Sequence, residues 1–278
     1  IFIFLSFELS VNLVNIFYEI MKFNYKIYIS VILFLLVVYT NYLANALPIG
    51  GVTTGEVSDL LDNLFTPTGF TFSIWGIIYS ALLVFLISIF WTPNNLKPFI
   101  IKILFLFNIN CLLNISWIFV WHYNVFPLSL IIMLCLLYTL ILISRIINQH
   151  YKDFKSSYLY NITSFSFNIY FGWITVATVA NFTGLLVSYE WGGFGISHEV
   201  WTSIIILVAI AIASFTFIKN KAIWYLLPII WAFYGIYYKH SSGNLEGYYP
   251  LIIYALLFGM SVLLFLLLRN LYYYLIKI

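Results

Sequence analysis

The stretch Phe72-Ser-Ile-Trp75-Gly-Ile-Ile-Tyr79 places a tryptophan and a tyrosine inside a long hydrophobic run. Phe72, Trp75 and Tyr79 follow the three-and-four spacing that brings side chains to one face of an α-helix. Indole and phenol groups carry polar atoms, which cost free energy when they are exposed to lipid hydrocarbon. The stretch therefore predicts a membrane-spanning helix with one face turned toward a protected interior.

Two further hydrophobic runs carry the same kind of face. One contains Asn114-Ile-Ser-Trp117, and the other contains Tyr170-Phe-Gly-Trp173 with Asn181 further along. Each set again follows helical spacing. Three helices are thus expected to offer aromatic rings and amides at a similar depth, where they could converge.

The composition excludes a water-soluble protein. The chain has 278 residues, of which 64% are hydrophobic and 8% are charged, and its mean hydropathy is +1.03. Soluble domains carry about 25% charged residues. We therefore expect an all-α, polytopic integral membrane bundle, and because the basic residues are scattered near helix ends we expect no nucleic-acid partner.

A membrane-spanning helix needs about 20 mostly apolar residues. The hydrophobic runs between Gly, Pro, Asn and charged breaks predict eight spans. They cover residues 27–47, 69–91, 99–121, 126–147, 160–187, 200–218, 222–238 and 248–270.

Charge placement supports this even number of spans. Eleven of the twelve basic residues fall on one side of the membrane, and only Lys239 falls on the other. Cytoplasmic loops carry the excess of Lys and Arg, so both termini are expected in the cytoplasm.

The beginning of the chain departs from this pattern. Residues 1–20 contain Glu8 and Glu19 and precede the first methionine, Met21, so we expect them to be a non-native or disordered extension. A signal peptide ending near Ala44-Asn-Ala46 is the alternative for the segment that follows. Its apolar run is long for a signal peptide, which favours a retained first helix.

The residue inventory excludes several membrane-protein classes. The late spans have no central lysine for a retinal Schiff base, and the spans contain no acidic or basic residue of the kind that ion pumps use. The sequence offers no catalytic residue and no metal-ligand pattern.

The polar-aromatic faces allow two interpretations. Amides often connect helices in membranes, and aromatic faces can line a ligand cavity. Such a cavity would suit a flat, apolar ligand with a few polar groups. The connector 47–64 would then be a lid over the cavity, or a plain surface loop.

At these faces the chain resembles the tryptophan-rich sensory protein/translocator protein (TspO/MBR) family. The resemblance rests on Pro67-Thr-Gly-Phe70-Thr-Phe72 with Trp75-Gly-Ile-Ile-Tyr79, on Leu113-Asn114-Ile-Ser-Trp117, and on Tyr170-Phe-Gly-Trp173 with Asn181. It covers about residues 27–190 and is closest to a longer form with extra C-terminal helices. It implies a five-helix membrane bundle for 21–190 and three additional helices in 191–278.

The resemblance also implies a ligand class. Members bind porphyrins or other tetrapyrroles, without a required cofactor, in an aromatic cavity inside the bundle. The corresponding ligand-binding residues here are Phe72, Trp75, Tyr79, Asn114, Trp117, Tyr170, Trp173 and Asn181. Three positions depart from the family pattern: Phe70 replaces a tryptophan, Ile169 replaces a proline, and Glu190 stands where the sterol-recognition pattern needs a basic residue. Sterol binding is therefore not expected.

Light-dependent porphyrin breakdown is known in the family, but no enzyme activity is assigned from the sequence. A facilitative transporter or exporter of a small hydrophobic metabolite is the alternative function, and a purely structural subunit is a third. The expected partners are the lipid bilayer and a small hydrophobic ligand, with self-association into a homodimer left open.

Overall fold

The computed structural model describes residues 2–46, 49–61, 63–220, 222–243 and 245–276, and every regular element in them is helical. The α-helices are α1 (Phe2–Ala46), α2 (Thr54–Asp59), α3 (Ile74–Ser88), α4 (Lys97–His122), α5 (Phe126–Gln149), α6 (Tyr151–Phe154), α7 (Tyr158–Ser188), α8 (His198–Asn220), α9 (Ile223–Ser241) and α10 (Pro250–Ile276). Short 3₁₀ turns are η1 (Ile49–Gly51), η2 (Gly69–Ser73), η3 (Ile89–Trp91), η4 (Asn94–Leu96) and η5 (Gly193–Gly195). The predicted all-α membrane bundle is confirmed.

Within the described residues, seven helices are long and apolar enough to cross a membrane. They correspond to seven of the eight predicted spans. The remaining prediction, 222–238, falls on α9, which is a helix of 19 residues but is not one of the seven. Its tyrosines, Pro228 and the terminal Lys239-His240 reduce its hydropathy, although α9 still packs inside the bundle between α7 and α10.

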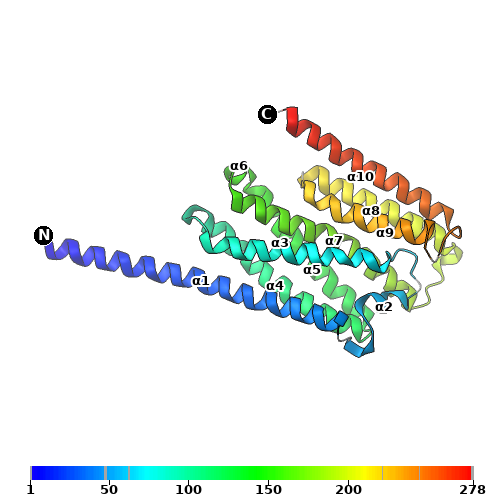
Figure 1. Cartoon of the computed structure of the whole chain (residues 1–278), viewed down its shortest axis with the longest axis horizontal. Coiled ribbons are helices and arrows are strands. Elements are labelled where there is room, and N and C mark those ends of the chain that lie inside the picture. The colour runs from blue at the N-terminus through cyan, green and yellow to red at the C-terminus, as the bar shows by residue number, and fades with distance from the viewer. Residues whose placement is uncertain (1, 47–48, 62, 221, 244, 277–278) are drawn as a thin grey trace.

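Helix α7 lies at the centre of the bundle and packs against α3, α5 and α9 (Figure 1). In its most apolar stretch 56% of the residues are buried, against 28–39% in the other six spans. Helices α1, α4 and α5 lie on one side of it, and α8, α9 and α10 lie on the other (Figure 1). A residue on almost any face of α7 therefore meets another helix.

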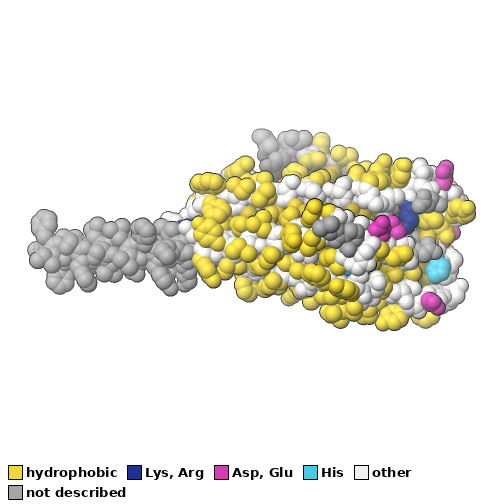
Figure 2. Space-filling model, turned by 60° about the horizontal axis from the view of Figure 1, so that its bottom comes forward, with side chains coloured by type: hydrophobic (Ala, Val, Ile, Leu, Met, Phe, Trp, Pro, Cys, Tyr) yellow, Lys and Arg dark blue, Asp and Glu magenta, His cyan; other side chains and the backbone are white. Residues whose placement is uncertain are grey.

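The two ends of the bundle differ in charge. The end that carries α6 and the last turn of α10 also carries Lys97, Arg145 and Lys219 (Figure 1). The opposite end carries α2, and acidic side chains gather there, while hydrophobic side chains cover the flank of the bundle (Figure 2). The predicted separation of charges along the bundle axis is thus visible in the fold, whereas the orientation of the termini stays a prediction.

The prediction for residues 1–20 also stays open. Residue 1 lies outside the described residues, and the backbone of α1 is helical from Phe2 onward.

Candidate functional site

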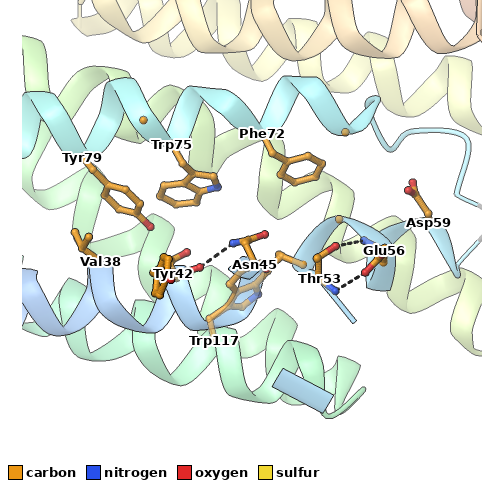
Figure 3. Close-up of a pocket in the computed structure, with 15 residues that line it drawn as sticks. Val38, Tyr42, Asn45, Thr53, Glu56, Asp59, Phe72, Trp75, Tyr79 and Trp117 are labelled. Carbon is orange, nitrogen blue, oxygen red and sulfur yellow. Dashed lines mark hydrogen bonds between the residues drawn. The ribbon is translucent and has the colours of Figure 1, made fainter. Parts of the chain in front are cut away.

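A cavity of about 700 Å³ lies between α1, α3, α4 and the short helix α2 (Figure 3). Its volume falls in the range of small-molecule sites, about 300–1,000 Å³. Helix α1 packs mainly on α4 and has little contact with α3, so the cavity occupies the space between α1 and α3.

The α3 wall is the aromatic face that the sequence predicts. Phe72 in η2 and Trp75 and Tyr79 in α3 all line the cavity, and Figure 3 shows the rings of Trp75 and Tyr79 pointing from α3 toward α1. The rings of Trp75 and Tyr79 are stacked, with centroids 5.2 Å apart and an interplanar angle of 25°. The spacing of these residues thus places three rings along one wall.

Helix α4 contributes Trp117, a residue that is 9% exposed and lines the cavity. Trp117 stacks on Trp121 at 5.5 Å, and the indole Nε1 of Trp121 donates a hydrogen bond to the backbone oxygen of Thr54 at 3.3 Å. The same face of α4 therefore forms one wall and holds α2 in place.

Tyr170 and Trp173 on α7 lie behind the cavity wall rather than on it. Their rings contact Trp75 edge to face, at 5.8 Å and 6.3 Å, and Trp173 also contacts Phe72 at 5.8 Å. Both are buried, at 3% and 4% exposure. These two residues fix the positions of the lining rings.

Asn114 is also outside the cavity. Its Oδ1 accepts a hydrogen bond from Asn41 Nδ2 at 3.0 Å, and its own Nδ2 donates to the hydroxyl of Tyr170 at 3.1 Å. This polar chain joins α1, α4 and α7. In this arrangement Asn41, not Asn114, reaches the cavity lining.

Asn181 lies away from the other predicted residues. Its Oδ1 accepts a hydrogen bond from Ser129 Oγ on α5 at 2.9 Å, and it does not line the cavity. The structure thus brings four predicted residues to the cavity wall, places Asn114, Tyr170 and Trp173 in the layer behind it, and puts Asn181 in the α5–α7 interface.

Sequence reasoning missed the α1 wall, formed by Val38, Asn41, Tyr42 and Asn45. Asn45 Nδ2 donates to the backbone oxygen of Asn41 at 2.8 Å, so these amides form one polar strip. Two asparagines four residues apart in an apolar helix were the available signal.

Sequence reasoning also left α2 undefined within the connector 47–64. Thr53 and Glu56 form a capping box: Thr53 N–H donates to Glu56 Oε2 at 2.6 Å, and Glu56 N–H donates to Thr53 Oγ1 at 3.2 Å. The bond from the Thr53 backbone lowers the pKa of the Glu56 carboxyl. Both residues line one end of the cavity together with Asp59, and the lid over the cavity stays a hypothesis (Figure 3).

Two hydrogen-bond donors on the cavity wall have no partner among the described residues. They are the hydroxyl of Tyr79 and the indole Nε1 of Trp117, and both atoms are buried. Most buried polar atoms in proteins are hydrogen-bonded. Because neither atom is accessible in this conformation, each side chain must rotate slightly before its donor can reach an acceptor on a ligand.

A family model described as TSPO-like protein matches residues 27–269. The chain belongs to the TSPO-like protein family. The match reaches beyond the predicted 27–190 and includes α8, α9 and most of α10. No curated protein and no solved structure matches the chain.

Proposed function

We propose that this TSPO-like membrane protein binds a planar, largely apolar ligand of the porphyrin or tetrapyrrole class in the cavity between α1 and α3. The observation that carries the proposal is the aromatic wall of Phe72, Trp75 and Tyr79, opposite Trp117. Ring faces stack on planar π systems, and donors on the wall orient polar edges of a ligand.

The second layer supports rigid binding. Tyr170 and Trp173 hold Trp75 from behind, and the chain of hydrogen bonds through Asn114 ties α1 to α4 and α7. A wall held in this way loses little conformational freedom when a ligand binds, which favours affinity.

Titration of protoporphyrin into the purified protein, followed by tryptophan fluorescence, tests the proposal. Wild-type protein should show saturable quenching. Trp75→Leu should weaken the affinity by about tenfold because a stacking face is lost. Trp91→Leu is the matched control, since Trp91 is 75% exposed at the end of η3 and does not line the cavity.

Equal affinities for the wild type and Trp75→Leu would contradict binding at this site. Transport is tested separately in sealed vesicles that contain the protein. Saturable binding without porphyrin flux supports a binding protein, whereas flux abolished by Trp75→Leu would favour the facilitative transporter.

A further inference from the structure

The end of the cavity beneath α2 is acidic. Glu56 and Asp59 line it, and none of the described lining residues is Lys, Arg or His. Both Glu56 and Asp59 are exposed, and the Glu56 carboxylate also accepts the hydrogen bond of the capping box. A ligand edge at this end therefore meets negative side chains.

The opposite end offers donors. Tyr79 in α3 lies seven residues after Phe72 in the preceding η2, which separates them by about 10 Å along the helix direction. Its hydroxyl and the Trp117 Nε1 have no hydrogen-bond partner among the described residues, and the Trp117 side chain is more than nine-tenths buried. Figure 3 shows Tyr79 at one end of the cavity and Glu56 with Asp59 at the other.

We propose that the cavity selects its ligand by charge and orientation: a planar ligand with a hydrogen-bond acceptor at the Tyr79 end and a cationic group, such as an ammonium, at the Asp59 end. This inference rests on the proposed function and specifies its ligand. A carboxylate at the acidic end would be repelled, and an ammonium would be attracted. Because these acidic groups lie near water, each changes the affinity only by about threefold.

Three probes that share the same porphyrin ring test this selection. They are protoporphyrin as its diacid, its dimethyl ester, and a bis-amide in which each carboxyl group is coupled to a short chain that ends in a primary amine. Each is titrated into the full chain in a neutral detergent at low ionic strength, with tryptophan fluorescence as the readout. The expected order of affinity is amine, ester, acid, with about tenfold between amine and acid. About 0.5 M salt should reduce this difference, because it screens exposed charges.

Asp59→Asn should reduce the difference between amine and acid about threefold. Asp153→Asn is the matched control, because Asp153 lies in α6 at the other end of the bundle. The salt dependence of the wild-type affinities tests, without any substitution, whether charge causes the preference for the amine over the acid.

The outcomes separate the two proposals. If none of the three probes binds saturably, the proposed function fails and this inference fails with it. If all three bind with equal affinity, or the acid binds most tightly, charge selection is overturned while the porphyrin cavity stands.

Discussion

At the scale of single residues, the cavity wall holds a tyrosine whose hydroxyl has no partner in the described protein. Tyr79→Phe should therefore leave the apparent melting temperature unchanged or raise it, because a buried unsatisfied group is removed. If an acceptor atom of the porphyrin accepts a hydrogen bond from the Tyr79 hydroxyl, the substitution should also lower the affinity for the porphyrin about fivefold. Thermal unfolding and fluorescence titration measure the two effects.

Tyr170→Phe is the comparison for that substitution. It removes the group that accepts the hydrogen bond from Asn114 Nδ2 and leaves a buried amide unsatisfied, so it should destabilise the protein by about 1–3 kcal/mol. Equal loss of stability in both variants would show that the Tyr79 hydroxyl has a partner in the free protein.

Residue spacing predicted part of the site and could not predict the rest. Phe72, Trp75 and Tyr79 reach the cavity because helical spacing alone places them on one face. Asn181 follows the same spacing pattern on α7, but α7 is surrounded by helices, so its polar residues face different neighbours. Which neighbour each residue meets depends on packing, which spacing does not specify.

At the scale of elements, the contact between α7 and α9 depends on a glycine. A Cβ at Gly172 would overlap the backbone oxygen of Tyr225 and approach the ring of Pro228 to 3.2 Å. Gly172→Ala should therefore destabilise the protein by about 1–3 kcal/mol, since backbone cannot move aside as a side chain can. The apparent melting temperature in detergent measures this.

Gly76→Ala is the matched control in a helix of the same bundle. A Cβ at Gly76 meets nothing within 4 Å, and alanine is the better helix former, so stability should stay the same or rise by up to about 1 kcal/mol. A loss at Gly76 equal to that at Gly172 would mean that the close approach of α7 and α9 is not the cause.

Helix α9 also organises the segment that leads into the cavity. Lys239 Nζ donates hydrogen bonds to the backbone oxygens of Asn63 and Thr66, at 3.1 and 3.3 Å. Trp231 Nε1 donates to the Thr71 oxygen at 2.9 Å, so this tryptophan holds η2 instead of lining the cavity. Trp231 lies in the middle of α9, and its partner, 160 residues away in the sequence, is defined only by the fold.

At the scale of the whole molecule, the separation of charge along the bundle predicts its orientation. The end rich in Lys and Arg should face the cytoplasm, with both termini on that side. Single cysteines introduced as Lys155→Cys and Ser197→Cys, in a background without Cys111 and Cys135, report this through a membrane-impermeant thiol reagent. Ser197→Cys should react in intact cells, and Lys155→Cys only after permeabilisation; the reverse pattern would overturn the orientation.

The central position of α7 bears on how the chain enters the membrane. Its mean hydropathy of 1.4 is the lowest of the seven spans, and the share of its residues that is buried is the largest. A helix of this kind gains little from lipid alone, because its polar residues need partners on neighbouring helices. Stable insertion of α7 therefore depends on α3 and α5, which are synthesised before it, and is completed by α9, which is synthesised after it.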